Sequence, residues 1–588
     1  MKAADFIAKY LESRGVTHIF ELSGGMITHL LDSISQQTTI RLVSMHHEQS
    51  AAFAVDGYAR VTGIPGVAMA TSGPGATNLL TGIGSCYFDS VPAVFITGQV
   101  NTHEQRGDRP IRQLGFQETD IVAMAEPVTK ACFRVSKAAD IPSILDRAFA
   151  IATEGRCGPV LIDLPMDVQR ADIVVPVEPA HGTSLPISSA LFGDPTVSDR
   201  TPPLPADIFD DIFTDIGNAR RPLILAGRGI RAASAVGEFT HAVKVTNIPV
   251  IASLLGLDVL PYEDPLRAGF IGSYGNRWAN IAFGEADFIL VLGSRLDIRQ
   301  TGADTRFFEG RKIYHVDCVE GEINNRIKDT IPVVADVKNF LRAFLDKAKG
   351  RIFPPKTEWL EHIQALREKW PDTKELETKG INPNGFMHIL SRASRSAGSV
   401  LADVGTHQMW TAQSYELSEG QLFLTSAGMG AMGFSLPAAI GACLGSGKKP
   451  ALVLVGDGCM QINLQELQTV YRNALPIKIV VLNNQHLGMI RQFQDSYFES
   501  RYQSTLWGYS APDFAKVAEA FGIEARTISG EEEVRDAVEW LWAGPNPEKP
   551  QLLQVMIDPR ANAYPKIAFG KPITEMEPFA KPVDMEGT

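Results

Sequence analysis

The sequence has little of three features that mark other protein classes. No two of its cysteines are separated by two residues, so neither a disulfide framework nor a zinc site is indicated. No run of about 18 apolar residues is present, which excludes an apolar transmembrane helix. The net charge of -12 argues against nucleic acid as the main partner. The six cysteines are Cys86, Cys132, Cys157, Cys318, Cys443 and Cys459.

What remains is the composition of a large globular protein. The chain has 588 residues, enough for three or four domains of roughly 150 residues each. The first 16 residues do not have the profile of a signal peptide. They place Phe6, Ile7, Tyr10 and Leu11 on one stripe of an amphipathic helix. We therefore expect a cytoplasmic protein with no membrane partner.

Short apolar runs alternate with helical patterns, which predicts parallel α/β structure. The runs fall into three groups, so we expect three doubly wound parallel-sheet domains. The runs are 66–71, 91–98 and 158–165; then 221–227, 248–253, 287–294 and 312–318; then 400–405, 451–458, 476–484 and 551–558. The expected domains are 1–170, 207–345 and 384–560, joined by linkers 171–206 and 346–383. The Pro-rich tail 561–588 either folds over the active site or stays mobile.

Two of these runs end in polar residues suited to a metal. Gly456-Asp457-Gly458 follows one expected strand, and Asn483-Asn484 follows the next, with 24 residues between Gly458 and Asn483. The carboxyl ends of parallel strands lie on one sheet edge, where ligands bind. A carboxylate and an amide oxygen are hard ligands that suit Mg²⁺ shared with phosphate oxygens. Either element alone favours a simple turn or strand cap, but together they favour a metal–diphosphate site.

The segment GDGCMQINLQELQTVYRNALPIKIVVLNNQHLGMIRQFQ (456–494) resembles the acetolactate synthase large subunits among the thiamine diphosphate enzymes. The resemblance runs from about residue 2 to about residue 560. It implies an N-terminal pyrimidine-binding domain, a central FAD-binding domain and a C-terminal diphosphate-binding domain. It also implies thiamine diphosphate, Mg²⁺ and FAD as cofactors. The metal ligands would be Asp457, Asn484 and the backbone carbonyl of His486.

The resemblance places the activating carboxylate at Glu48, which precedes a helical pattern. A carboxyl group there would perform general acid–base work on the aminopyrimidine ring of the cofactor. A lone Glu at a helix N-terminus more often only stabilises the helix dipole, and the metal motif favours the catalytic role. Because the family pairs pyrimidine and diphosphate domains from different subunits, the resemblance implies a homodimer or homotetramer.

Further site residues follow from the same resemblance. Met432 would hold the cofactor in a bent conformation, although plain core packing would also explain a methionine there. Gly25, Phe116 and Gln117 would face the reacting carbon, and Phe493 stands where a tryptophan favours 2-ketobutyrate as acceptor. Val404, Gly405, Thr406, His407, Gly430, Gly456 and Gly458 would contact thiamine diphosphate.

Six segments of the central domain match flavin-contacting segments of the family. Any one glycine-rich turn is weak evidence, but six in register favour FAD, which would be structural because carboligation is redox-neutral. The residues concerned are Gly227, Arg228, Gly229, Ser253, Leu254, Gly272, Tyr274, Arg295, Asp297, Arg299, Asp317 and Asp336.

The expected reaction is decarboxylation of pyruvate and transfer of its two-carbon unit to a second carbonyl, giving 2-acetolactate when that carbonyl is pyruvate. A larger ketone acceptor, such as a nucleotide-linked keto sugar, is the alternative, and a non-catalytic cofactor-binding homologue is a third. An unusually long loop carries Arg106, Arg109 and Arg112. These arginines either recognise an anionic acceptor or form salt bridges to Asp108 and Glu104. A small regulatory subunit is a further possible partner.

Overall fold

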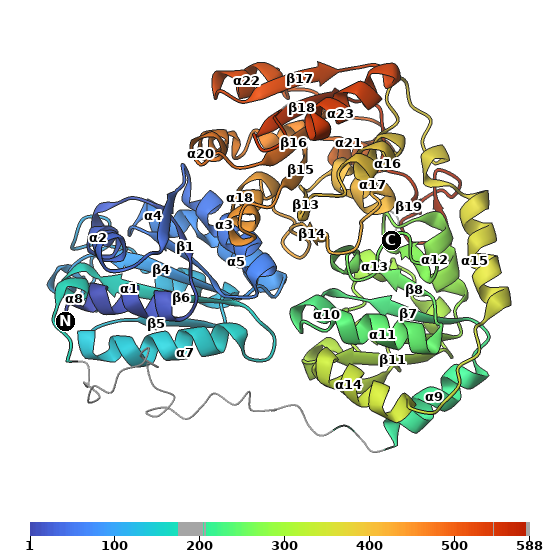
Figure 1. The fold of residues 1–588 in the computed structure, drawn as a ribbon, viewed down its shortest axis with the longest axis horizontal. Coiled ribbons are helices and arrows are strands. Elements are labelled where there is room, and N and C mark those ends of the chain that lie inside the picture. Colours follow the sequence, from blue (N-terminus) through green and yellow to red (C-terminus); the bar gives the residue numbers. More distant parts are fainter. Residues whose placement is uncertain (175–203, 205–206, 545, 584–588) are drawn as a thin grey trace. The chain divides into compact units, whose positions relative to one another are not determined.

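The computed structural model describes residues 1–174, 204, 207–544 and 546–583 and contains three six-stranded sheets (Figure 1). Most of the expected linker 171–206 therefore lies outside the described residues. Two compact units are distinguished. The first comprises 1–199, 426–451 and 463–477, and the second comprises 200–425, 452–462 and 478–588. Among the described residues, no helix is both long and apolar enough to cross a membrane.

The first sheet belongs to the first unit and has the strand order β2-β1-β3-β4-β6-β5, all parallel. Its central strands are buried along their whole length, which explains their continuous apolar sequences. Val67, Val94 and Val160 pack on one face with apolar residues of α1 and α7. The strands are β1 (His18–Leu22), β2 (Arg41–Ser44), β3 (Gly66–Ala70), β4 (Ala93–Gln99), β5 (Ala131–Arg134) and β6 (Pro159–Pro165). The helices of this unit are α1 (Ala3–Ser13), α2 (Thr28–Gln37), α3 (Glu48–Thr62), α4 (Pro74–Asn78), α5 (Leu80–Phe88), α6 (Ile121–Ala125), α7 (Ile141–Thr153), α8 (Met166–Arg170), α18 (Ser435–Gly445) and α20 (Leu467–Arg472).

Helices α3 and α18 pack with their backbones in contact. A Cβ atom added at Gly57 would lie 2.0 Å from the carbonyl oxygen of Ala438, and one added at Gly441 would lie 1.8 Å from that of Ala54. Both helices are buried almost throughout. Only glycine permits such a close approach of two backbones. The packing of α3 against α18 therefore fixes the position of Glu48, the first residue of α3.

The second sheet has the order β12-β11-β10-β7-β8-β9 and is also parallel. Numbered within the sheet, this is the order 3-2-1-4-5-6 of dinucleotide-binding folds, which bind their ligands where the chain order reverses, here between β7 and β10. The strands are β7 (Pro222–Ala226), β8 (Val250–Ala252), β9 (Arg267–Phe270), β10 (Phe288–Leu292), β11 (Lys312–Asp317) and β12 (Ile331–Val334). Its helices are α9 (Ile208–Asn218), α10 (Arg228–Ala232), α11 (Val236–Thr246), α12 (Arg277–Glu285), α13 (Ile298–Thr301) and α14 (Val337–Ala348), followed by α15 (Thr357–Lys369).

The third sheet has the order β14-β13-β15-β16-β18-β17, the same relative order as the first. Its strands are β13 (Ser399–Ala402), β14 (Leu422–Leu424), β15 (Ala451–Gly456), β16 (Ile477–Asn483), β17 (Glu524–Ile528) and β18 (Gln551–Met556). The helices are α16 (Pro383–Ala393), α17 (Thr406–Ser414), α19 (Asp457–Met460), α21 (Gly488–Tyr497), α22 (Phe514–Ala520) and α23 (Val534–Ala543). Three parallel α/β sheets confirm the predicted fold class, and the strands of each sheet fall within one expected domain. The domain boundaries themselves stay predictions.

The described part of the tail is folded. Its two short strands, β19 (Lys566–Ile567) and β20 (Met576–Glu577), pair antiparallel. The backbone N–H of Ile567 donates to the carbonyl of Ser273 (2.8 Å), and the buried Arg277 donates to the carbonyls of Met576 and Glu577. The tail therefore packs on the loop that follows β9.

Candidate active site

The loops after β13, β15 and β16 meet at the carboxyl edge of the third sheet. Asp457 follows β15 directly, and Asn484 follows β16. The backbone N–H of Gln485, from the second loop, donates to the carboxylate of Asp457. The prediction that the two motifs lie together at one sheet edge is therefore consistent with the structure.

Asp457 is a buried carboxylate, with 2% of its surface exposed. Burial raises its pKa to about 6, although hydrogen bonds from Tyr509 and from backbone N–H groups oppose the rise. The hydroxyl of Tyr509 donates to Oδ2 over 2.9 Å. Burial disfavours the charged form of a carboxylate and a cation offsets that cost, so the burial of Asp457 suits a metal ligand.

Asn484 and His486 form a tight turn beside Asp457. Both are buried. Oδ1 of Asn484 accepts from the backbone N–H of His486 over 3.2 Å, and Nδ1 of the His486 ring lies 2.8 Å from the carbonyl oxygen of Asn484. Between them Gln485 adopts a positive φ of 58°. This turn presents amide and carbonyl oxygens, the donor types that Mg²⁺ requires.

Glycines leave room around the buried ring of His407. A Cβ atom added at Gly405 would lie 2.6 Å from Cε1 of that ring, and one at Gly456 would lie 2.7 Å from Nδ1. Burial lowers the pKa of His407 to about 4, so the ring is neutral near pH 7. Its Nε2 is buried and has no hydrogen-bond partner in the described structure. An unpaired buried nitrogen in a glycine cradle fits a ligand that carries phosphate oxygens.

Asp403, His407 and Cys459 form a buried group whose potential ligand atoms lie within 4.8 Å of one another. The thiol of Cys459 donates to the carbonyl oxygen of Val404 over 3.0 Å. Thr406, at the start of α17, is buried as well, whereas Val404 and Gly405 are partly exposed. Asp403 and His407 follow β13, and Cys459 follows β15 close to Asp457, so the group belongs to the candidate diphosphate site.

In the first unit, Glu48 begins α3 and is buried, with 6% of its surface exposed. The side-chain amide of Asn78, the last residue of α4, donates to Oε2 of Glu48 over 2.9 Å. A Cβ atom at Gly75 would lie 3.3 Å from Oε1. The Asn78 amide thus holds Oε2 in place, whereas Oε1 faces the backbone of Gly75, which has no side chain.

Three other predicted residues follow the carboxyl ends of strands in the same sheet. Gly25, after β1, has open space where a Cβ atom would be. Gln117 adopts a positive φ of 66° and packs over Gly73, where a Cβ atom would lie 3.1 Å from Cβ of Gln117. Phe116 beside it is 79% exposed. The ring of Phe116 is therefore accessible, but a single exposed apolar side chain does not by itself mark a site.

The loop that carries Gly430 and Met432 is held by two polar side chains. The carboxylate of Asp89 accepts from the backbone N–H groups of Ala427 (3.0 Å) and Gly428 (2.8 Å). The amide of Asn463 donates to the carbonyl of Gly433 over 2.8 Å. Met432 is only partly buried, so it is not an ordinary core residue.

Asn463 also contacts the helix that begins at Glu48. Its Oδ1 accepts from the hydroxyl of Ser50 (3.1 Å), and its Nδ2 donates to Oε1 of Gln49 (3.2 Å). Through one side chain, the loop of Met432 and the start of α3 are fixed to each other within the first unit.

Phe493 lies on α21 in an aromatic cluster. Its ring centroid is 4.6 Å from that of Tyr497 and 5.9 Å from that of Phe498. Phe569 of the tail contacts Tyr497, with ring centroids 6.1 Å apart. Phe493 is 37% exposed, so part of its ring is available to a substrate.

The arginine loop does not form the expected salt bridges. Arg106 donates to the carbonyl of Ile111 and Arg109 to that of Gln105, each over 3.2 Å, while Arg112 is exposed. In the described residues none of the three pairs with Asp108 or Glu104. The salt-bridge prediction is wrong because Glu104 instead caps the turn at Asn101.

The predicted flavin residues lie at one edge of the second sheet. Each of the six segments lies at the carboxyl end of a different strand, from Gly227 after β7 to Asp336 after β12. At the switch point, a Cβ atom at Gly227 would lie 2.2 Å from the carbonyl oxygen of Gly293, and one at Gly229 would lie 2.6 Å from Cα of Gly293. The two central loops therefore touch through glycine backbones, as expected where a dinucleotide binds.

The polar residues among them stabilise this edge. Asp297 and Asp336 are N-caps of α13 and α14, and each accepts two backbone hydrogen bonds. Arg295 lies 3.3 Å from Asp297. The carbonyl of Arg299 accepts from the backbone N–H of Ser273, beside Gly272.

The other predicted flavin residues lie at the same edge. Asp317 ends β11, and its carboxylate accepts from the backbone N–H of Val319. Tyr274 is buried, which raises its pKa to about 12. The remaining predicted residues here, Arg228, Ser253 and Leu254, begin the turns after β7 and β8.

Three family models match the chain. They are the N-terminal thiamine pyrophosphate (TPP) binding domain (residues 1–124), the central domain (209–344) and the C-terminal TPP binding domain (403–555) of thiamine pyrophosphate enzymes. Acetolactate synthase 2, chloroplastic, of Nicotiana tabacum is 35% identical over 97% of this chain and 84% of its own length.

Prokaryotic relatives agree. The acetolactate synthase large subunit of Lactococcus lactis is 34% identical over 97% of this chain and 95% of its own length. The probable acetolactate synthase large subunit of Methanocaldococcus jannaschii is 36% identical over 98% and 95%. The chain belongs to the acetolactate synthase family. Its recognition from the GDG and NN motifs is confirmed.

Sequence reasoning missed several residues of this acetolactate synthase family site. Tyr509 contacts Asp457 from 52 residues away along the chain, and no local pattern announces it. Asn78, the partner of Glu48, follows the Gly73-Pro74-Gly75 turn after an expected strand, a signal that could have found it. Asp89 and Asn463, which hold the loop of Met432, carry no motif.

Proposed function

We propose that this chain is a thiamine diphosphate-dependent carboligase that decarboxylates pyruvate and transfers the two-carbon unit to a second pyruvate, giving 2-acetolactate. The observation that carries the proposal is the meeting of the buried Asp457 carboxylate with the Asn484 turn at the edge of the third sheet. The names of the relatives support the product, since all those described above are called acetolactate synthases.

The residues present fit a divalent metal and a diphosphate. Asp457, Asn484 and the carbonyl of His486 would hold Mg²⁺, which prefers such oxygen ligands. The unpaired Nε2 of His407 would face the diphosphate oxygens. The backbone at Val404, Gly405, Thr406, Gly456 and Gly458 would approach the diphosphate, because these residues end or follow β13 and β15 at the carboxyl edge of the sheet. When bound, thiamine diphosphate supplies the electron sink that a decarboxylation needs.

Glu48 would perform the acid–base step. Asn78 fixes Oε2, so the carboxyl group has one orientation in which Oε1 is directed away from that amide. We assign to Glu48 the holding of a proton at N1′ of the aminopyrimidine, which is general acid–base catalysis. Gly430 and Met432, on the loop fixed by Asp89, would support the cofactor. Gly25, Phe116, Gln117 and Phe493 would line the substrate side.

The second sheet would bind FAD as a structural group. Its strand order and the glycine contact at the switch point are the features of dinucleotide sites. The carboligation moves no electrons between substrate and flavin, so no residue is assigned a redox role. Flavin released on heat denaturation, identified by its absorption and by chromatography, would test this part separately.

The deciding experiment is product analysis. The purified protein is incubated with thiamine diphosphate, Mg²⁺, FAD and pyruvate, first alone and then with a panel of acceptors. We expect carbon dioxide and 2-acetolactate from pyruvate alone. If product forms only with a large acceptor, such as a nucleotide-linked keto sugar, that acceptor replaces the second pyruvate in the proposal. No carbon dioxide release under any condition would leave a cofactor-binding protein without this activity.

Assembly and location are part of the same proposal. We propose a homodimer or homotetramer, because the family completes each cofactor site with domains from two subunits. Light scattering of the purified protein tests this. A small regulatory subunit would appear as a second chain on co-purification from the native cell. We keep the cytoplasm as the proposed location, to be tested by fractionation, and note that the tobacco relative is named chloroplastic.

A further inference from the structure

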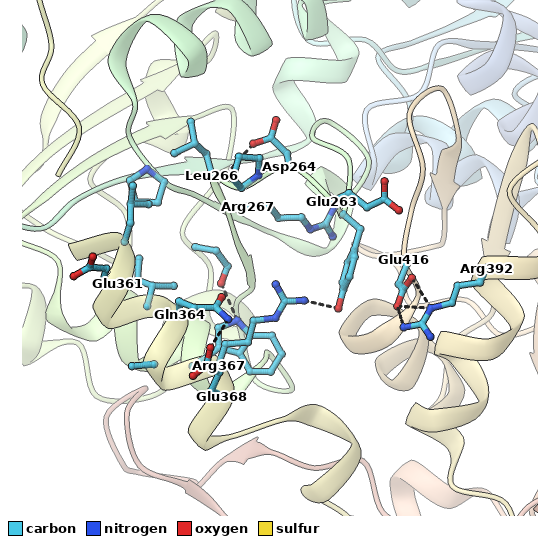
Figure 2. Close-up of a pocket in the computed structure, with 18 of the residues that line it drawn as sticks. Glu263, Asp264, Leu266, Arg267, Glu361, Gln364, Arg367, Glu368, Arg392 and Glu416 are labelled. Carbon is cyan, nitrogen blue, oxygen red and sulfur yellow. Dashed lines mark hydrogen bonds and ion pairs between the residues drawn. The ribbon is translucent and has the colours of Figure 1, made fainter. Parts of the chain in front are cut away.

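A cavity of about 940 Å³ lies at the amino ends of β8 and β9, in the second unit (Figure 2). Pro249 and Leu266 precede these strands, whereas the candidate flavin segments follow their carboxyl ends. The cavity is also lined by α15, by the last turn of α16 and by the segments that follow α16 and α17. Its volume is within the range of ligand pockets, and it lies at the sheet edge opposite to the candidate flavin loops.

Two guanidinium groups meet in this cavity around one tyrosine ring. Arg267 begins β9 and Arg367 belongs to α15. The guanidinium carbon of Arg267 lies 5.6 Å from the centroid of Tyr262, and that of Arg367 lies 5.1 Å from it. Figure 2 shows both side chains extending into the same part of the cavity. Burial lowers the pKa of Arg267 to about 10, and the nearby charge of Arg367 acts in the same direction.

Neither guanidinium forms an ion pair with a carboxylate in the described structure. Arg267 donates only to the carbonyls of Leu257 (2.8 Å) and Leu260 (2.7 Å). Arg367 donates only to the hydroxyl of Tyr262 (2.6 Å). The remaining N–H groups of these two forks have no protein partner there. Two partly buried cations without a direct ion pair are costly, so this pair is not explained by stability alone.

The other two arginines of the cavity form ion pairs, which makes Arg267 and Arg367 distinctive. Arg392 is bound to Glu416 (2.7 Å) and Arg395 to Glu263 (2.6 Å). The nearest carboxylates to Arg267 are engaged elsewhere. Asp258 pairs with Arg231 (3.2 Å), and Asp264 caps the backbone of Leu266 (2.9 Å). Glu361 and Glu368 also line the cavity, but both are exposed at the surface of α15.

We propose that Arg267 and Arg367 bind an oxyanion, a phosphate or carboxylate group of a small molecule, in this cavity. Guanidinium forks match the paired oxygens of both groups and form charge-assisted hydrogen bonds. Trp278, Leu266 and Ile363 provide apolar wall for the rest of the molecule. The bound oxyanion joins β9 of the central sheet to α15, and so stabilises the junction of the central and C-terminal domains. The proposed function of the chain does not require this site.

The test uses full-length protein saturated with thiamine diphosphate, Mg²⁺ and FAD. Inorganic phosphate and succinate are titrated by calorimetry, with sodium chloride at equal ionic strength as the reference, and the arm that saturates identifies the group. In Arg367→Gln we expect roughly 10- to 100-fold weaker binding, the loss of a charge-assisted hydrogen bond. The control is Arg392→Gln. Arg392 lines the same cavity but already has an ion pair, so this variant should bind the anion as tightly as wild type does.

A second measurement does not depend on any variant. Crystals of the wild type soaked in tungstate, an analogue of phosphate, should show anomalous density between Arg267 and Arg367. The proposal is overturned if neither anion binds saturably to the wild type, if Arg367→Gln binds as tightly as wild type, or if the soaked crystals show density only elsewhere.

Discussion

The hydroxyl of Tyr509 donates a 2.9 Å hydrogen bond to Oδ2 of Asp457, the carboxylate to which we assign the metal. Tyr509 is far along the chain from Asp457, and the bond ties the loop before α22 to the end of β15. Of the two carboxylate oxygens, Oδ2 is thereby occupied by a neutral donor. Oδ1 is the oxygen that we assign to the cation.

Tyr509→Phe should weaken metal binding without abolishing it. The phenol orients a buried carboxylate through a hydrogen bond to a charged group, worth about 1.5–3 kcal/mol. We therefore expect the Mg²⁺ concentration for half-maximal activity to rise about tenfold or more. Tyr471→Phe, which replaces an exposed tyrosine, is the matched control. Asp457→Ala sets the upper limit and should lose metal-dependent binding of thiamine diphosphate. Unchanged Mg²⁺ dependence in Asp457→Ala would move the metal site elsewhere.

Glu48→Gln should lower kcat while cofactor binding stays nearly intact. Loss of a general acid–base group costs on the order of 10²–10⁴-fold in rate, and a glutamine can still accept the hydrogen bond from Asn78. Activity and thiamine diphosphate binding are measured on the same preparation. Glu21→Gln serves as control, because Glu21 is also buried in the first unit but lies on β1 and contacts Ser44. A variant at Glu48 with full kcat would remove the assigned mechanism.

Gly229→Ala should reduce bound flavin. The added methyl group would lie 2.6 Å from Cα of Gly293, so one of the two loops at the switch point must shift. The ratio of flavin to protein absorbance reports the loss. Gly237→Ala is the control, since nothing lies within 4 Å of its added Cβ atom and alanine favours the helix α11. Equal flavin content in both variants would contradict the assignment of this edge to FAD.

His388 should make stability fall at alkaline pH. Burial alone would lower the pKa of His388, but its contacts with Asp372 (3.0 Å) and Glu416 (2.9 Å) raise it to about 9. Because this pKa exceeds that of an unfolded histidine, the stabilisation is complete below about pH 6.5 and is lost as pH rises through about 9. The loss is on the order of 3 kcal/mol.

The measurement is the thermal midpoint between pH 6 and pH 9.5. Wild type should lose stability over this interval, and His388→Gln should already be destabilised at pH 6 and change less. His362→Gln, at an exposed position on α15, should follow the wild-type profile. If wild type and His388→Gln fall in parallel, the ion-pair cluster does not control the alkaline limit.

The sequence predicts the interior of the three sheets better than their edges. The runs at 66–71, 287–294 and 451–458 became β3, β10 and β15, because strands buried on both faces are continuously apolar. The strands not predicted include every edge strand. In β17 the charged Glu524 and Arg526 flank Ala525, and β2 has only Leu42 and Val43 as apolar residues, so neither strand gives a long apolar run. β1 is the one interior strand missed, since His18 and Glu21 interrupt its apolar residues.

The candidate site shows a similar division. The Asp457 and Asn484 motifs could be placed at one edge because parallel topology brings strand ends together. The hydrogen bonds of Glu104 could not be predicted, because a carboxylate in a loop can accept from several donors. Here it accepts from the turn at Asn101 and not from Arg106 or Arg109. Tyr509, Asp89 and Arg367 gain their roles from contacts between segments far apart in sequence, and no spacing rule reports such contacts.

The contact between α3 and α18 also limits how early the N-terminal domain can fold during synthesis. The apolar face of α3 is complete roughly 370 residues before α18, which covers it, leaves the ribosome. At about 5–20 residues per second, that delay is roughly 20–70 s. A fragment ending before α18 would present this bare face to solvent, so the N-terminal domain of a nascent or truncated chain should engage chaperones and fold late. Glycines that permit backbone contact in the finished enzyme thus make its first domain depend on its last.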